Sequence, residues 1–156
     1  NVTYARMPIE AIEFAQNSFD IVLSSLALHY VPSFDSVAKR VRACLSQGGS
    51  FVFSVEHPIF TAQGPQDWVY DDRGQIAHFP VDNYFYEGAR RANFLGETVT
   101  KYHKTLTTYL DGLLDNGFEL MRIVEPKPPA SMMDRPGMKD EMRRPMMLIV
   151  SARRRD

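Results

Sequence analysis

Several features are missing from this 156-residue sequence, and each absence narrows its class. Cysteine occurs once, at Cys44, so no internal disulfide forms, and no cysteine or histidine spacing fits a zinc site. Glycine is absent before Gly48, which excludes a glycine-rich cofactor loop from that part of the chain. No hydrophobic run approaches the roughly 20 residues that span a bilayer. Net charge is −1, which argues against general binding to nucleic acid or anionic membranes. These features predict a globular, cytoplasmic protein without a metal site.

The stretch from Ser18 to Phe60 predicts a strand, a helix and a second strand. Ile21–Leu23 is an apolar run without polar alternation, which is typical of a strand covered on both faces by helices. Ser33 is a suitable N-cap, and Gly48-Gly49 are expected to stop the helix before a strand at Phe51–Phe53. The predicted helix has a regular apolar stripe at Phe34, Val37, Ala38, Val41, Cys44 and Leu45. Ligands of such open α/β sheets bind beyond the carboxyl ends of the strands.

The next segment, residues 57–96, is too long for a simple connection and is predicted to form a cap with a turn at Asp71–Gly74. Its many aromatic rings either enclose a substrate or form a small core of the cap itself. An extended segment at Glu97–His103 and a helix closed by Asn116-Gly117 are expected to follow. Strands at 118–125 and 146–151, with a short helix within 132–144, complete the predicted order of elements.

Four segments of the chain resemble the class I S-adenosylmethionine-dependent methyltransferases that act on small molecules. They are SFDIVLSSLALHY, GGSFVFSVEHPIF, YFYEGAR and VTKYHKTL, in this order. The resemblance implies an α/β fold with a Rossmann-like sheet, an inserted cap and a terminal antiparallel hairpin, in one domain over residues 1–156. It also implies S-adenosylmethionine as the cofactor.

The resemblance places Asn1–Ala5 on the third strand of that family. The family's glycine-rich loop and its acidic ribose-binding residue belong to earlier strands, so we expect the sheet to be incomplete at its amino end, as in a truncated chain. Open strand edges template pairing with other chains. We therefore expect a homo-oligomer or a strand-swapped assembly from this chain by itself.

Cofactor contacts are carried over from the resemblance to two loops. In the first loop many relatives carry an aspartate where this chain has Pro8, but the backbone amide of Ile9 would still reach the adenine. In the second, Ser24 and Leu26 would offer backbone groups to the methionine moiety; both residues also suit a simple strand-to-helix turn. The predicted cofactor-binding residues are Pro8, Ile9, Glu10, Ser24, Ser25 and Leu26.

His29 and His57 are the predicted catalytic residues, because each follows the carboxyl end of a predicted central strand. A histidine near its ordinary pKa of about 6.5 can deprotonate or orient an acceptor, and the alternative is a histidine bonded to a loop backbone. The predicted substrate-binding residues are Trp68, Tyr86, Arg90, Tyr102 and His103.

The sequence therefore predicts methyl transfer from S-adenosylmethionine to a small-molecule acceptor in the complete enzyme. Neither nucleic acid nor a membrane is an expected partner. The alternative is a catalytically silent, methyltransferase-like binding module, which the missing glycine-rich loop favours. A dehydrogenase of similar topology is a weaker alternative, because no dinucleotide fingerprint is present.

Overall fold

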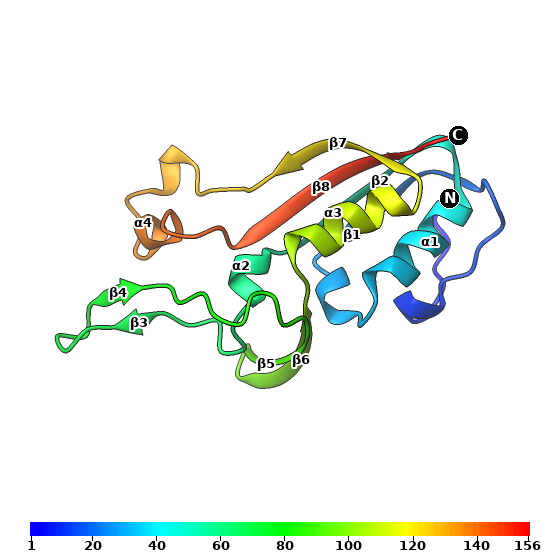
Figure 1. Cartoon of the computed structure of the whole chain (residues 1–156). Coiled ribbons are helices and arrows are strands. Elements are labelled where there is room, and N and C mark those ends of the chain that lie inside the picture. The colour runs from blue at the N-terminus through cyan, green and yellow to red at the C-terminus, as the bar shows by residue number, and fades with distance from the viewer.

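The computed structural model describes residues 1–156 and builds them into one four-stranded sheet with two separate hairpins (Figure 1). The sheet order is β1-β2-β8-β7, with β1 and β2 parallel and the other pairs antiparallel. The elements in chain order are η1 (Ile9–Ala11), β1 (Phe19–Ser25), η2 (Leu28–Tyr30), α1 (Phe34–Cys44), β2 (Leu45–Glu56), α2 (Pro58–Thr61), β3 (Val69–Tyr70), β4 (Ile76–His78), β5 (Gly88–Phe94), β6 (Glu97–His103), α3 (Leu106–Asp115), β7 (Phe118–Val124), η3 (Ala130–Met132), α4 (Met138–Glu141) and β8 (Met147–Arg154).

The predicted helix begins as expected but ends earlier. The Ser33 side chain accepts a hydrogen bond from Ser36 N, which confirms the N-cap. The helix stops at Cys44, and β2 begins at Leu45, so the prediction that Gly48-Gly49 stop the helix is wrong. The two glycines instead lie where the β1–β2 register shifts; Gly48 has φ +72°, and a Cβ at Gly49 would come 2.8 Å from Ser46 O. They permit an irregular strand entry rather than a helix end.

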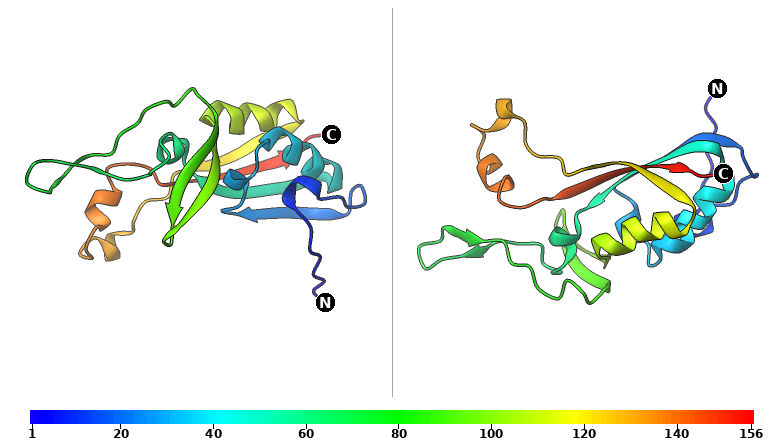
Figure 2. Two further views of the ribbon diagram at one scale, coloured as in Figure 1. Left: turned by 90° about the horizontal axis from the view of Figure 1, so that it is seen from below. Right: turned by 45° about the horizontal axis from the view of Figure 1, so that its top comes forward.

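The hydrophobic core lies under one face of the sheet. Both α1 and α3 lie against this face (Figure 2). The Phe34 ring of α1 contacts Phe53 of β2 and Tyr109 of α3, with centroids 5.3 and 5.0 Å apart. Alternate residues of β2 and β8 point into the same core, as the period of a strand requires. The helical cover predicted for the sheet is therefore confirmed on this face.

The opposite face of the sheet has no helix over it. Ile21 and Leu23 of β1 point to this face and are 67% and 71% exposed, so the expected coverage of this strand on both faces is wrong for the described residues. Asn1–Ala5 form no strand either, and Val2 and Tyr4 are 77% and 92% exposed. The reasons are related: no segment covers the side chains of Ile21 and Leu23, although β1 pairs with β2, and no segment pairs with the backbone of residues 1–5.

The predicted cap contains two hairpins. Asp71 accepts hydrogen bonds from Arg73 N and Gln75 N and so closes the predicted turn between β3 and β4. This hairpin projects away from the sheet (Figure 1). The second hairpin pairs β5 with β6, so it crosses the boundary predicted at residue 96.

The carboxyl-terminal predictions are confirmed. Helix α3 ends before Gly117, whose φ is +73°, and β7 and β8 form the antiparallel pair. The short helix expected within 132–144 is α4. No helix has the length and apolar character that crossing a membrane requires.

Candidate functional site

An apolar groove of about 360 Å³ lies at the carboxyl end of β1. Ile9 of η1 lines one part of it, and Ser24 and Ser25 line the strand end. Pro8 and Glu10 flank Ile9 in the chain, although neither lines the groove. The structure thus brings three of the six predicted cofactor-binding residues to one groove.

The backbone amides of Leu26 and Ile9, one in each loop, differ in their hydrogen bonding within the protein. Leu26 has φ +50°, and its amide donates to both the carbonyl and the hydroxyl of Ser54, at 3.0 and 3.1 Å. That amide is therefore engaged within the protein, and only the Leu26 carbonyl remains for a ligand. Ile9 opens the turn η1, where backbone amides have no partner within the helix.

His29 lies in η2, directly beyond β1, and its side chain is buried. Its Nδ1 accepts a hydrogen bond from Glu56 N at 3.3 Å, which assigns the ring proton to Nε2. Burial lowers the pKa of His29 to about 4, and the charges of Lys101 and Lys104 add to this effect while Glu56 opposes it. His29 is thus neutral at neutral pH.

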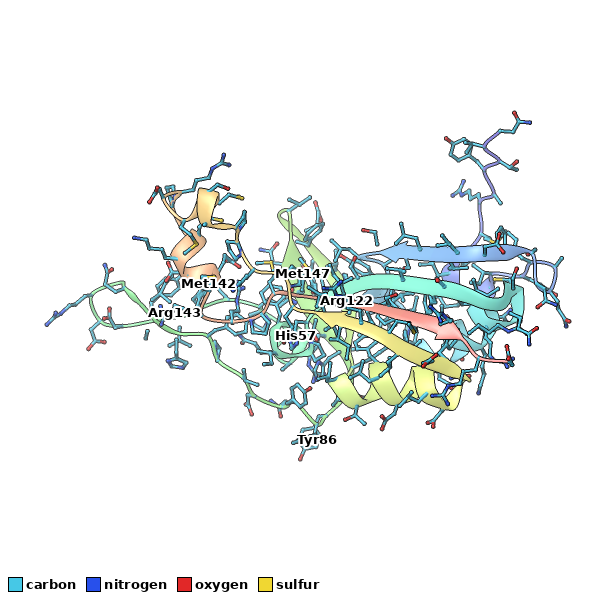
Figure 3. The ribbon with its side chains drawn as sticks, turned by 90° about the horizontal axis from the view of Figure 1, so that it is seen from above. His57, Tyr86, Arg122, Met142, Arg143 and Met147 are labelled. Carbon is cyan, nitrogen blue, oxygen red and sulfur yellow. The ribbon has the colours of Figure 1, made fainter.

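His57 caps α2 and faces groups of the protein on both sides of its ring. Nδ1 accepts a hydrogen bond from Ile59 N at 3.1 Å, and Nε2 is enclosed 2.9 Å from Glu125 Oε1, outside hydrogen-bond geometry. Burial lowers the pKa of His57, and the Glu125 carboxylate opposes the shift. This arrangement suits a positioning role at the end of β2 (Figure 3).

A buried ion pair ties β6 to the end of β2. Lys101 Nζ lies 2.6 Å from Glu56 Oε1, and Gln66 bonds to both groups, at 2.8 and 2.7 Å. Sequence reasoning did not single out this cluster. The available signal was a glutamate at the carboxyl end of the apolar run Phe51–Val55 and a lysine between β-branched and aromatic residues of β6.

Lys104 is also buried, but its surroundings differ. Its ammonium donates to Val31 O at 2.6 Å and to Tyr102 O at 3.2 Å, and it forms no ion pair. Burial lowers the pKa of Lys104 to about 8, with Glu87 opposing the shift, so the ammonium keeps its charge at neutral pH.

His103 and Tyr102 lie on β6, and His103 is held from both sides. Nε2 lies 2.8 Å from Tyr84 O, so it donates there, and Nδ1 accepts from the Thr61 hydroxyl at 2.8 Å. Burial also lowers the pKa of His103. Tyr102 is half-buried, with its ring 5.7 Å from Lys104 Nζ.

The other predicted substrate contacts lie elsewhere. Trp68 packs edge-on against Phe79, and its ring lies 4.8 Å from the guanidinium of Arg144. These contacts favour the alternative in which the ring belongs to a small core of the cap. Arg90 donates to the backbone oxygens of Ala62 and Tyr86. Tyr86 extends from the outside of the molecule (Figure 3). The five predicted substrate residues therefore do not converge on one cavity.

Comparison with known proteins explains this arrangement of elements. Residues 1–53 match the family model described as a methyltransferase domain. A Listeria monocytogenes protein, solved as a candidate S-adenosylmethionine-dependent methyltransferase, is 51% identical with a TM-score of 0.93, over 99% of this chain and 69% of that one. The chain belongs to the S-adenosylmethionine-dependent methyltransferases. A Mesorhizobium loti methyltransferase of the same kind is 41% identical with a TM-score of 0.88, over 97% of this chain and 69% of that one.

The methyltransferase fold and its cofactor, S-adenosylmethionine, are thus confirmed at the level of the family. A curated Haemophilus influenzae protein of unassigned function is 30% identical over 154 residues. That match covers 95% of this methyltransferase chain but only 59% of the relative, so the chain spans about three fifths of the curated protein.

Proposed function

We propose that this chain forms the acceptor side of a methyltransferase that transfers a methyl group from S-adenosylmethionine to a small molecule. The observation that carries the proposal is the pairing of an apolar groove at the end of β1 with a buried polar cluster beyond β2. Both lie at the carboxyl ends of parallel strands, where ligands of such sheets bind.

The residues around the groove fit the cofactor in part. The apolar lining suits the adenine ring, the Ile9 amide would donate to one of its nitrogens, and the Ser24 and Ser25 end of β1 suits the methionine part. When bound, the cofactor supplies a methyl group on a positively charged sulfur. The chain contributes the rest: it orients the acceptor, encloses it and excludes water.

The three buried histidines differ in the role that their hydrogen bonds allow. His57 and His103 have their ring nitrogens directed at protein groups and hold α2 and β6 in place. His29 has one ring nitrogen engaged, and its Nε2–H donates to no protein group, so it is the histidine that suits contact with the acceptor. Because it is neutral and its Nδ1 is occupied, it acts as a hydrogen-bond donor rather than as a general base.

A silent binding module is the second candidate, and one observation favours it. No acidic side chain lines the groove to hold the ribose hydroxyls. Such a module would keep the acceptor side without methyl transfer.

Titration calorimetry with S-adenosylmethionine tests the proposal. We expect weak or no binding by the 156-residue chain alone, because the groove lacks ribose contacts, and clear binding by a version extended at its amino end with its native upstream sequence. Micromolar binding by the 156 residues alone would contradict this account of the site. An extended version that does not bind would support the silent module.

A further inference from the structure

The methionines of this chain gather in one stretch. All of them except Met7 lie between Met121 and Met147, and the proposed function uses none of them. Several line an apolar groove of about 370 Å³ that begins just beyond β7. We call it the methionine groove, and its lining residues are Pro126, Lys127, Pro128, Met132, Met138, Glu141, Met146 and Met147.

The lining of the methionine groove combines stiff and adaptable residues. Pro126 and Pro128 follow β7, and their rings fix the backbone φ near −65°. The groove methionines come from η3, from α4 and from the start of β8, and they are half-buried. Methionine side chains are unbranched and polarizable, so they adjust to the shape of an apolar ligand. The groove therefore suits an apolar group without a fixed shape, such as an aliphatic chain.

The charged residues of the methionine groove require no charge on the ligand. The carboxylate of Glu141 is held by Arg144, whose two terminal nitrogens donate to it at 2.8 and 3.2 Å. Lys127 is exposed, so water solvates its ammonium. The other lining residues are methionines and prolines. The groove thus offers burial to apolar surface and holds no buried, unpaired charge for a ligand to neutralise.

The size of the methionine groove fits a small molecule rather than a protein. Its volume of about 370 Å³ lies within the range of roughly 300–1,000 Å³ that is typical of small-molecule sites. A stable protein–protein interface takes roughly 20–30 residues from each partner, far more than line this groove.

The methionine groove adjoins the end of β2. Met147 pairs with Glu56, the last residue of β2, and His57 N donates to Met146 O at 2.8 Å. A neighbouring cavity shares part of the lining of the groove and reaches Ile59 of α2. The groove therefore lies at the same end of the sheet as the carboxyl ends of β1 and β2 (Figure 2). From β1 to β7 the sheet order covers three strand spacings, or about 14 Å.

We propose that the methionine groove binds an uncharged aliphatic chain of the methyl acceptor, while the reacting group of the acceptor lies at the ends of β1 and β2. The inference rests on the proposed function in taking the ligand to be the acceptor. An acceptor that reaches both places spans about 14 Å, so it is an extended molecule with an apolar end rather than a compact polar one.

1-Hexanol is a direct probe of the methionine groove. Hexane-1,6-diol is its matched control, because a hydroxyl at each end leaves the diol no apolar end to bury. We expect 1-hexanol to shift the signals of the groove methionines in a saturable way in spectra of the chain labelled with ¹³C at its methionine methyl groups. The signals of Met7 and Met121, which are exposed and lie outside the groove, should stay unchanged.

The diol should bind at least about tenfold more weakly than 1-hexanol, because its second hydroxyl would be buried without a partner. Equal affinity for the two probes would overturn the proposal. So would the absence of a saturable shift with 1-hexanol, or shifts of the same size at Met7 and Met121.

Two substitutions at α4 form a matched pair. Met138→Trp fills the methionine groove, whereas Met142→Trp adds the same ring at a residue that is 47% exposed and does not line it. We expect the Kd for 1-hexanol to rise about tenfold or more in Met138→Trp and to stay within about threefold in Met142→Trp. Circular dichroism checks that both variants fold. Equal affinities in the two folded variants would contradict the position of the site.

Calorimetry with S-adenosylmethionine separates this inference from the proposed function. We expect the version extended at its amino end to bind both the cofactor and 1-hexanol. Cofactor binding without 1-hexanol binding would overturn the aliphatic site and keep the proposed function. Binding of 1-hexanol without cofactor binding would keep the aliphatic site and overturn its role in methyl transfer.

Discussion

On one face of the four-stranded sheet, Phe51 and Phe53 are fully buried beneath α1 and α3, whereas on the other face Ile21 and Leu23 stand open to solvent. All four of these residues are apolar. The apolar run of β1 therefore predicts that other segments cover the strand on two faces, and the described residues cover it on only one. Apolar character predicts where a side chain is stable, but burial depends on which segments are there to provide it.

The largest expected effect separates the two faces directly. Phe53→Ala should lower the free energy of unfolding by about 3–5 kcal/mol, because it opens a cavity between α1, α3 and β2. Leu23→Ala should change it by less than about 0.5 kcal/mol, as expected for an exposed site. Urea unfolding of both variants measures the difference. A loss at Leu23 as large as that at Phe53 would show that the bare face is covered in solution.

The free energy of unfolding should also fall in acid, because His29 is buried in its neutral form. The folded-state pKa of His29 is about 4, below its value of about 6.5 in an unfolded chain, so protons bind the unfolded state first as pH falls. Stability should be full above about pH 6.5 and decline by up to on the order of 3 kcal/mol as pH falls toward 4. Unfolding curves between these pH values measure it. His29→Asn should flatten the decline, and Leu23→Ala should leave it unchanged.

A smaller contrast of the same kind exists within the cap. The Arg144 guanidinium lies 4.7–4.9 Å from the ring centroids of Phe60, Trp68 and Phe79, while Tyr86 is exposed. Trp68→Ala should cost about 1–3 kcal/mol of stability and lower the Tm, whereas Tyr86→Ala should lie within about 0.5 kcal/mol of the native chain. Thermal unfolding followed by circular dichroism distinguishes them. If instead Trp68→Ala kept its Tm and weakened acceptor use, the ring would belong to the substrate site.

The smallest effect concerns association. The free edge of β1 and its bare face should draw two copies of the 156-residue chain together, so light scattering should give a mass above that of a monomer. Leu23→Glu should shift this mass toward the monomer, and Glu119→Gln on β7 is the control. A cooperative, well-folded native monomer at all concentrations would contradict this expectation.

Local patterns predicted most of the fold. The Ser33 cap, the Asp71–Gly74 turn and the helix closed by Gly117 each depend on residues close in the chain, and all three are confirmed. The single cover of β1 was not predictable, because it depends on a partner segment rather than on β1 itself. Gly48-Gly49 were misread because glycine serves both helix ends and irregular strands.

The candidate site was less predictable, since its residues converge from distant segments. His29 and Glu56 meet through a hydrogen bond between the histidine ring and the backbone, which no sequence spacing encodes. Lys101 and Lys104 lie three residues apart, yet one is paired with a carboxylate and the other is not. That difference depends on the tertiary structure: the end of β2 brings the Glu56 carboxylate beside Lys101, whereas the loop after η2 brings the Val31 carbonyl beside Lys104.

The place of β8 in the sheet also sets the order of events during synthesis. β8 is the last strand of this chain, yet it lies between β2 and β7 and is interior to the sheet. While residues 57–146 leave the ribosome, the edge of β2 that β8 will occupy stays open, with Phe51, Phe53 and Val55 beside it. An open apolar edge is prone to aggregation, and pairing over such a sequence separation is slow. A stop codon shortly before Met147 would therefore remove a middle strand of the sheet rather than trim its end, and would leave β7 with no strand to join it to the β1–β2 pair.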